Sequence, residues 1–524
     1  MILLAALESV VGTYALPQYL PPNPFNWLFI RLAIVQVSLW AIWAVFIYPF
    51  FFSPFLDLPH PKGGLPLFGH GAAMFNKPPG KDFLNMMTSV PNDGLIHFRG
   101  FFYRDRLLLT DPKALAEVLV TKTYDFEKPS RVRAFLRTVL GDGLIIVEGD
   151  EHKFQRKHIM PVFSFRHIKD LYPIFWDKAT ALTQSLATEI AESPIYSSNE
   201  KAKVTGDVEV NHWANKVTMD IIGLAGLGRE FNALKNSDDK LIQNYEEILE
   251  PTSEKVLFFT LNILMGRSFV RLLPWKVNER MRITTSTLRD VCRQLVRDKR
   301  DLIKMKGAEQ IDLLSILIKS NNFSDDQLVD QLLTFLAAGH ETTSSAFTWT
   351  THMLATHTDI QTRLRAEIHK HVPSASSSNT ADLVTILESL PLLNAVCNET
   401  LRLYPTVPVT IRDSIRPTSI LGHPIPAHTQ ILLCPWATNR STTLWGPNAA
   451  EFVPERWIDY DAEKGVRPED GRPNNHGGSQ SNYSNLTFLH GPRSCIGQGF
   501  AKAELRALVA AFVGCYEWGM ADPD

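Results

Sequence analysis

FLHGPRSCIGQG, residues Phe488–Gly499, is the stretch that decides the fold: a glycine-rich loop with a single cysteine. Gly491 and Gly497 remove side chains where a flat, bulky cofactor would need the backbone to come close. The apolar run Phe500–Val513 predicts a helix directly after the loop. The positive end of that helix would favour the thiolate form of Cys495. The loop therefore predicts a metal-binding cysteine.

The same loop also allows a less specific interpretation, a buried structural cysteine in a glycine-rich turn. Zinc fits poorly, because His490 and Cys495 offer two ligands and nothing nearby completes four. Arg493, a permanent cation two residues before the sulfur, fits a thiolate that binds haem iron. The loop taken alone leaves the structural and the haem-binding interpretations open.

Phe488, Gly491, Arg493, Cys495 and Gly497 match the pattern F-x-x-G-x-R-x-C-x-G. With this pattern the chain resembles the cytochrome P-450 family of haem-thiolate monooxygenases, in its microsomal, fungal-type form. The resemblance implies haem b (iron protoporphyrin IX) as the cofactor, with Cys495 as the axial ligand of the iron and the other four residues around the haem. It also implies the fold class: mainly α with small β-sheets, the cytochrome P-450 fold, preceded by one N-terminal transmembrane helix.

A second motif lies in the middle of a long helix predicted over Ser324–Thr350. Gly339 weakens this helix locally, and Thr342 can donate a hydrogen bond to a carbonyl one turn back, which bends the backbone and admits water. An acid beside a hydroxyl, as in Glu341-Thr342, is suited to relaying protons. The run resembles the family's A-G-x-(D/E)-T-T. This implies that Glu341 and Thr342 deliver protons and that Ala338 and Gly339 line the oxygen pocket.

The resemblance also implies a structural role for three charged residues, which would fix the core on the haem side. Glu399 and Arg402 stand three residues apart on a predicted helix, close enough to pair, and match E-x-x-R. Arg456 matches F-x-P-E-R and completes the implied buried triad. As an exposed pair, Glu399 and Arg402 would instead contribute under about 1 kcal/mol. Between these motifs, Val407–Arg412 resembles the pocket-lining strand whose arginine, Arg412, reaches a haem propionate.

A further pair is implied on the basic stretch Glu151–His158, which is predicted to be helical. His152 and Arg156 lie four residues apart and therefore on one face. The family pattern here is W-x-x-x-R, whose two side chains reach a haem propionate; this chain places His152 where tryptophan is usual. Because His152 can still donate a hydrogen bond, the resemblance implies a cofactor-binding role for both. Lys153 and Lys157 would project elsewhere, toward an acidic partner or toward solvent.

The N-terminal part predicts a membrane anchor after an N-terminal segment of residues 1–31. Residues 32–52 carry no charge and are long enough to cross a bilayer as one helix. The Pro/Gly-rich stretch 53–70 predicts a hinge, and residues 71–524 the haem-thiolate catalytic domain. A buried core helix is the alternative for 32–52, although nothing upstream could cover it. A cleaved signal is disfavoured, because the apolar segment starts late and lacks a basic region before it.

Composition sets broad limits on the class of protein. A chain of 524 residues that is 45% hydrophobic can bury a large core, in one large domain or in two or three ordinary ones. A formal net charge of −2 argues against a nucleic-acid-binding protein. The five cysteines are scattered and include no C-x-x-C, which indicates a reducing compartment without a disulfide framework.

Three other stretches carry local predictions. Ile96–Leu109 alternates and predicts a short β-hairpin. Val256–Met265 is apolar between loops, which predicts either core packing or a second membrane contact near a substrate entrance. The polar tract 461–485 predicts a surface insertion.

Taken together, the resemblance implies a membrane-anchored monooxygenase that activates O2 with electrons from NADPH. NADPH-cytochrome P-450 reductase would be the electron donor, with a b-type cytochrome as a further partner. The enzyme would hydroxylate or otherwise oxidise a small apolar substrate in secondary-metabolite biosynthesis. It would be a single-pass protein of the endoplasmic reticulum with its catalytic domain in the cytosol.

Two alternatives stay open from the sequence. An O2-independent haem isomerase or dehydratase of the same fold is one, and the Glu341-Thr342 pair argues against it. The other is a catalytically impaired haem-binding protein. It follows from the 29 residues after Cys495, which leave the expected terminal β-hairpin of the family truncated.

Overall fold

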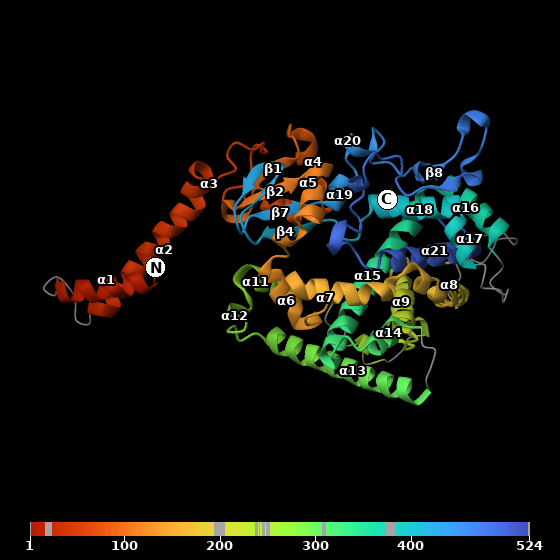
Figure 1. Cartoon of the computed structure of the whole chain (residues 1–524), viewed down its shortest axis with the longest axis horizontal. Coiled ribbons are helices and arrows are strands. Elements are labelled where there is room, and N and C mark those ends of the chain that lie inside the picture. The colour runs from red at the N-terminus through yellow and green to blue at the C-terminus, as the bar shows by residue number, and fades with distance from the viewer. Residues whose placement is uncertain are drawn as a thin grey trace. The chain divides into compact units, whose positions relative to one another are not determined.

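The chain divides into two units by its internal contacts: Met1–Glu117 with Val409–Ala437, and Val118–Pro408 with Thr438–Asp524. Figure 1 shows the computed structural model, with the elements labelled along the chain. The structure describes residues 2–15, 24–192, 205–235, 239, 241–243, 247, 252–306, 311–372 and 383–521.

The first unit begins with apolar helices. α1 (Ile2–Ala15) packs beside α2 (Pro24–Ile42) in Figure 1. α2 continues through the π-helical turn η2 (Trp43–Ile47) into α3 (Tyr48–Phe51). The resulting helical run, Phe25–Phe51, is long and apolar enough to cross a membrane, and none of its most apolar part is buried. This run begins before the predicted span of residues 32–52. The prediction took only the residues after Arg31, whereas Arg31 itself lies within the helix.

The rest of the first unit consists of a small sheet, a separate pair of short strands and several short helices. The strands of the sheet run in the order β1-β2-β7-β4, with β7 parallel to β2 and antiparallel to β4. β1 and β2 form the antiparallel hairpin that the alternation predicted, with Ile96 opposite Leu108. The elements are β1 (Leu95–Arg99), β2 (Asp105–Leu109), β4 (Thr410–Ser414), β5 (Thr418–Ile420), β6 (His423–Ile425), β7 (Gln430–Leu433), η3 (Gly71–Met74), α4 (Lys81–Ser89), η4 (Phe101–Tyr103) and α5 (Pro112–Ala116).

The second unit is mainly helical and holds the larger hydrophobic core. Its longer helices are α6 (Ser130–Leu140), α7 (Gly149–Ile159), α8 (Phe165–Glu192), α9 (Val210–Ile221), α11 (Ser253–Met265), α13 (Lys276–Lys306), α14 (Leu313–Ser320), α15 (Asp325–Thr356), α16 (Thr358–His371), α17 (Leu383–Ser389), α18 (Pro391–Leu403) and α21 (Gln498–Cys515). Shorter elements are β3 (Phe126–Glu127), η7 (Met160–Phe163), η8 (Ile222–Leu227), α12 (Arg267–Val270), α20 (Thr442–Trp445), η10 (Pro454–Trp457), η14 (Gly491–Arg493) and the pair β8 (Ile458–Asp459) with β9 (Arg472–Pro473).

α15 is the central helix of this unit and packs against α9, α13, α18 and α21 (Figure 1). Its start is fixed by a capping box: Ser324 Oγ accepts from the Gln327 backbone N–H at 3.3 Å, and Gln327 Oε1 accepts from the Ser324 N–H at 3.0 Å. These bonds satisfy helix N–H groups that would otherwise lack acceptors. The predicted helix is therefore present and extends six residues further, to Thr356. The predicted fold class, mainly α with small sheets, is confirmed.

Candidate active site

Cys495 lies in a tight loop directly before α21. The loop is closed by the Cys495 backbone N–H, which donates to the Phe488 carbonyl oxygen at 2.9 Å, and by the Ser494 N–H, which donates to the Gly491 carbonyl oxygen at 3.0 Å. Gly497 is the residue that precedes the first turn of α21. The cysteine is thus held by local backbone bonds at the entrance to a buried helix.

Gly491 and Gly497 of the loop have different surroundings. Gly491 has φ +76°, and a Cβ there would overlap the carbonyl oxygen of Leu119. The protein's own backbone is therefore one reason for a glycine at this position, and the role of Gly491 toward a cofactor stays a prediction. A Cβ at Gly497 would make only ordinary contacts, 3.8 Å from the Phe163 ring and 4.0 Å from Cys495 Sγ. Space beside the sulfur is therefore available on the Gly497 side.

Two opposing effects act on the pKa of the Cys495 thiol. Burial raises the pKa of the Cys495 thiol, and the Gly497 backbone N–H and the Arg156 charge lower it by less. Burial therefore opposes the effect of the helix N-terminus, which favours the thiolate. Cys495 is nevertheless exposed by its accessible surface. Cys495 is thus accessible at its surface while many protein atoms lie around its sulfur.

Arg493 is almost completely buried, with its side chain 4% exposed. Its guanidinium forms an ion pair with Glu148 and lies 5.0 Å from the centre of the Tyr124 ring. In the described part of the chain, its Nε and Nη2 find no hydrogen-bond acceptor. Buried guanidinium N–H groups are costly without acceptors. The arrangement therefore fits a bound group that presents a carboxylate to Arg493, as haem does with its propionates.

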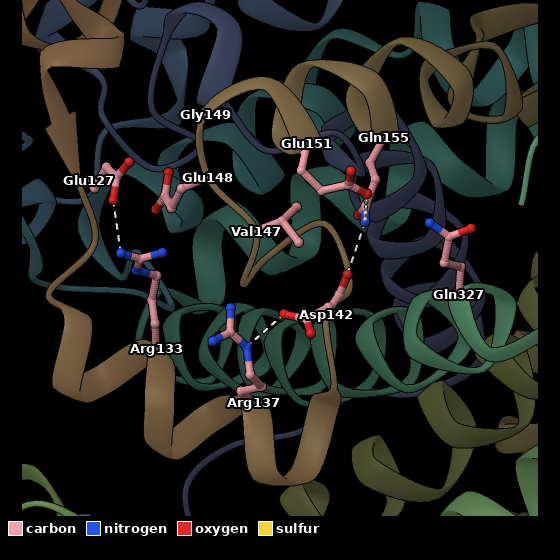
Figure 2. A pocket seen from close by; sticks show the side chains of 10 residues that line it. All are labelled: Glu127, Arg133, Arg137, Asp142, Val147, Glu148, Gly149, Glu151, Gln155 and Gln327. Atoms are coloured by element: carbon pink, nitrogen blue, oxygen red, sulfur yellow. Dashed lines mark hydrogen bonds and ion pairs between the residues drawn. The ribbon is translucent and has the colours of Figure 1, made fainter. Parts of the chain in front are cut away.

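Glu148 also borders a charged pocket of about 470 Å³ between α6 and the start of α7 (Figure 2). Figure 2 shows its arginines directed at carboxylates: Arg133 pairs with Glu127 at 2.8 Å and Arg137 with Asp142 at 2.6 Å. Because these charges are already paired, the pocket offers little to a charged ligand, and we assign it no ligand.

His152 and Arg156 both lie on α7, as predicted, and in different surroundings. His152 is buried, and its ring meets that of Tyr124 edge-on at 6.2 Å. Arg156 donates from Nη1 to the Ser494 carbonyl oxygen at 2.6 Å and from Nη2 to Ser494 Oγ at 3.3 Å. Arg156 therefore holds the cysteine loop directly. The roles of both residues toward a propionate stay predictions.

α15 exposes one narrow face in an otherwise buried stretch. Ala338 and Glu341 are exposed and Thr342 and Ser345 are half-buried, whereas Thr343 and Ser344 are buried. Spacings of three, four and seven residues place the accessible residues on one side of the helix. The predicted back-bond is confirmed: Thr342 Oγ1 donates to the Ala338 carbonyl oxygen at 2.7 Å. The helix therefore presents a hydroxyl and a carboxyl together.

Desolvation shifts the pKa values of two titratable side chains in this segment, Glu341 and His340. Protein atoms around Glu341 desolvate its carboxyl in part and raise its pKa, although the residue is exposed at the surface. Burial lowers the pKa of the neighbouring His340 to about 4. Gly339 has a packing explanation, because a Cβ there would come 2.7 Å from the Ile222 side chain. Ile222 of η8 therefore fills the space on the Cβ side of Gly339. The roles of Ala338 and Gly339 in lining an oxygen pocket stay predictions.

Phe163 connects this helix to the cysteine loop. Its ring is the closest neighbour of the position that a Cβ on Gly497 would occupy, and it meets the Phe335 ring of α15 edge-on at 5.6 Å. The loop and the helix are therefore joined through one aromatic side chain of η7.

The predicted buried triad is confirmed as a set of contacts. Glu399 Oε1 accepts from Arg402 Nη2 at 2.7 Å and from Arg456 Nε at 3.0 Å. Glu399 and Arg402 side chains are fully buried. Arg402 Nη1 also donates to the Asn439 and Ala449 carbonyl oxygens, each at 2.6 Å. The triad thus ties α18 to the segments that lead into the cysteine loop.

Arg412 lies in the first unit, on β4. It is buried, and it donates to Thr410 Oγ1 at 3.0 Å and to the Ile411 carbonyl oxygen at 2.8 Å. Burial lowers its pKa to about 10. No carboxylate of the described residues pairs with it, which is unusual for a buried guanidinium. Its role toward a propionate stays a prediction.

Sequence reasoning missed two buried residues. Trp457 Nε1 donates to Glu399 Oε2 at 2.9 Å, and Arg402 Nε donates to the same oxygen at 2.8 Å. Glu504 is a fully buried carboxyl on α21, close to Thr343, and burial raises its pKa well above the ordinary value. A charged residue inside the apolar run Phe500–Val513 was the signal that could have indicated it.

Comparisons with known proteins match this architecture. The family model described as Cytochrome P450 matches residues 59–524. Cytochrome P450 monooxygenase sphH of Aspergillus fumigatus is 39% identical over 92% of this chain and 86% of its own length. Cytochrome P450 monooxygenase ptmK of Penicillium ochrochloron is 39% identical over 94% of each chain. The crystal structure of the cytochrome P450DA heme domain superposes with a TM-score of 0.66, at 20% identity, over 87% of this chain and 90% of that one.

The fold and the cysteine loop define a cytochrome P450, and the chain belongs to that family. Within the family it is a monooxygenase. The predicted family and enzyme class are thereby confirmed, and the cofactor of the chain is a haem. Among the described residues, no group of three or more His, Cys, Asp or Glu could hold a separate metal ion.

Proposed function

We propose that this chain is a membrane-anchored monooxygenase that takes electrons from NADPH through NADPH-cytochrome P450 reductase, with a b-type cytochrome as a second donor. Its substrate is a small apolar molecule of fungal secondary metabolism. The proposal is supported most directly by one observation: the second unit combines an accessible, motif-matched Cys495 with an accessible Glu341-Thr342 face on its central helix.

The cofactor is haem b, and Cys495 Sγ is its iron ligand. Arg493 contributes buried N–H groups that find no acceptor among the described residues, as a propionate site requires. His152, Arg156 and Arg412 are the further cationic or hydrogen-bonding residues assigned to the propionates, and Phe488, Gly491 and Gly497 shape the loop around the ligand. When bound, the haem supplies the iron centre at which O2 is activated.

The chain's own contribution to oxygen chemistry is proton delivery. The Thr342 hydroxyl donates its hydrogen bond to the Ala338 carbonyl oxygen, so the lone pairs on Oγ1 are free to accept a hydrogen bond from a water. Glu341 lies on the same accessible face. The pKa of Glu341 is raised and therefore lies closer to neutral pH. An acid whose pKa lies near the working pH can both give a proton and regain it.

Membrane attachment is assigned to the helical run Phe25–Phe51. Trp27, Trp40, Trp43 and Tyr48 are exposed along it and suit the membrane–water interface. A single span with the catalytic part in the cytosol, at the endoplasmic reticulum, would place the chain beside its reductase.

The experiment is expression with a reductase in a yeast host under ¹⁸O2, with product profiling by mass spectrometry. We expect new products that each carry one ¹⁸O atom and that depend on NADPH and on the reductase. Products formed without label, or in anaerobic cells, would contradict a monooxygenase and favour an isomerase or dehydratase.

A further inference from the structure

Two residues of the protein hold the Arg493 guanidinium. Its Nη1 pairs with Glu148 Oε2, and its charge lies over the Tyr124 ring, 5.0 Å from the ring centre. A guanidinium is a rigid, planar fork, so fixing one end of it and packing it on a ring also restrict the direction of its other N–H groups. These groups are Nε and Nη2, which find no acceptor among the described residues.

The Glu148 carboxylate is itself fixed in place. Its Oε1 accepts a hydrogen bond from the Lys128 backbone N–H at 3.0 Å, and Lys128 Nζ lies 3.7 Å from the same oxygen. The Glu148 side chain is almost completely buried. Figure 2 shows that the arginines of the neighbouring pocket, Arg133 and Arg137, pair with other carboxylates. Glu148 therefore places a fixed, buried negative charge beside Arg493.

Tyr124 lies on η6 (Thr123–Asp125), and its ring contacts more than one cation. Lys153 Nζ lies 4.6 Å from the ring centre, and the Arg493 guanidinium lies 5.0 Å from it. Lys153 is exposed and pairs with Asp150 at 2.8 Å, whereas Arg493 is buried. A cation–π contact contributes most where the cation is desolvated. The contact with Arg493 is therefore the stronger of the two.

The charge of Glu148 has a consequence for a haem beside Arg493. A negative charge near a redox centre opposes the addition of an electron, and burial and nearby charge are among the properties that set a haem potential. Glu148 also shares Arg493 with any propionate bound there, so that propionate is less fully compensated. Both effects have the same sign and favour the ferric state.

We propose that Glu148 and Tyr124 are positioning residues that direct Arg493 toward a haem propionate, and that the charge of Glu148 makes the reduction potential of the haem more negative. Neither residue belongs to the motifs that carry the family resemblance. The inference rests on the proposed role of Arg493 toward a propionate.

The first measurement is the reduction potential of the whole chain loaded with haem. Glu148→Gln keeps the shape of the side chain and removes its charge. We expect the equilibrium to shift toward the ferrous form by roughly tenfold, or about 59 mV for one electron, the order expected for a buried unit charge at about 10 Å. Glu151→Gln is the matched control, because Glu151 is an exposed carboxylate on the same segment and is screened by solvent. Equal potentials in Glu148→Gln and the parent would overturn the electrostatic role.

The second measurement is the rate of haem transfer to apomyoglobin. Tyr124→Leu leaves every charge in place, so it tests the positioning of Arg493 without creating a buried, unpaired cation. We expect haem loss to be roughly twofold to thirtyfold faster, the range of a cation–π contact. Tyr124→Phe keeps the ring, and Lys153→Gln removes the other cation over it, so both should match the parent. A parent-like rate in Tyr124→Leu would overturn the positioning role.

Arg493→Gln separates the two ways in which this inference can fail. A parent-like rate of haem loss in Arg493→Gln would contradict the proposed propionate role and remove the basis of the inference. Fast haem loss in Arg493→Gln with parent-like loss in Tyr124→Leu would leave the propionate role intact and overturn the positioning by Tyr124 alone. The thiolate-haem spectrum of the haem-bound fraction checks that each variant is folded.

Discussion

The Arg156 guanidinium is bonded to Ser494, the residue immediately before the cysteine that the family motif assigns to the haem iron. Nη1 of Arg156 donates to the Ser494 carbonyl oxygen at 2.6 Å, and Nη2 donates to Ser494 Oγ at 3.3 Å. A charged donor on a helix thus fixes the backbone of the loop one residue from Sγ. Hydrogen bonds from a charged group are among the stronger contacts in proteins.

Arg156→Ala is expected to loosen the cysteine loop. It removes charge-assisted hydrogen bonds of roughly 1.5–3 kcal/mol and leaves the Ser494 carbonyl without this donor. We expect a smaller fraction of the protein to show the thiolate-haem spectrum, and a lower thermal midpoint. Arg156→Lys should recover part of both effects. An unchanged spectrum in the alanine variant would mean that the loop's own backbone bonds suffice.

Cys495→Ala should abolish the absorption of the reduced, CO-bound protein at the thiolate-haem position, because the other cysteines lack this loop. Cys515→Ala is the matched control, since Cys515 is also a free and exposed cysteine. It should keep the band. If the band persists in Cys495→Ala and disappears in Cys515→Ala, the ligand assignment is wrong.

Glu399→Gln should destabilise the helical unit strongly. The side chains of Glu399 and Arg402 are both fully buried, so removing the carboxylate leaves a buried guanidinium without its counter-charge. Breaking a buried pair in this way costs about 3–5 kcal/mol. Chemical denaturation, or loss of soluble haem-containing protein, would report it. Glu279→Gln removes the partner of Arg282 at the surface and should leave the denaturation midpoint unchanged.

These residues also show what could be predicted from sequence. Glu399 and Arg402 are three apart on one helix, and Arg456 belongs to a short motif, so local spacing and resemblance were enough to find them. Trp457 could not be assigned to Glu399, because their contact depends on how separate segments pack. The close neighbours of two glycines could not be predicted either, for the same reason. Gly491 lies against the Leu119 carbonyl oxygen, and Gly339 lies against the Ile222 side chain.

The desolvation of Cys495 is a second property that could not be predicted from the sequence. A helix N-terminus after the loop could be predicted from the sequence, and its effect on the sulfur has the expected sign. How closely protein would surround the sulfur could not be predicted. Burial therefore dominates the thiol pKa in the folded chain.

His340 predicts a specific pH dependence of stability. Burial lowers its folded-state pKa to about 4 from an ordinary value of 6.5. Between these values the unfolded chain binds a proton that the folded chain does not. The contribution of the neutral His340 to the free energy of unfolding is therefore fully present above about pH 6.5. It is lost progressively as the pH falls toward 4, by up to roughly 3 kcal/mol. The free energy of unfolding should show this fall in the parent relative to His340→Asn. Parallel pH profiles for the two proteins would contradict it.

Thr342→Ala tests the proposed proton delivery. The variant loses the hydroxyl that is bonded to the Ala338 carbonyl, while the surrounding helix keeps its buried contacts. Haem content and substrate affinity should therefore change little. Product formation should slow by roughly tenfold to a thousandfold, the range expected when a positioned proton transfer is lost. NADPH consumption should continue, with the electrons released as hydrogen peroxide. Thr342→Ser keeps the hydroxyl and should restore coupling. Product, NADPH and peroxide measured in one assay decide the matter, because an alanine variant that couples NADPH to product as well as the parent does would remove Thr342 from the mechanism.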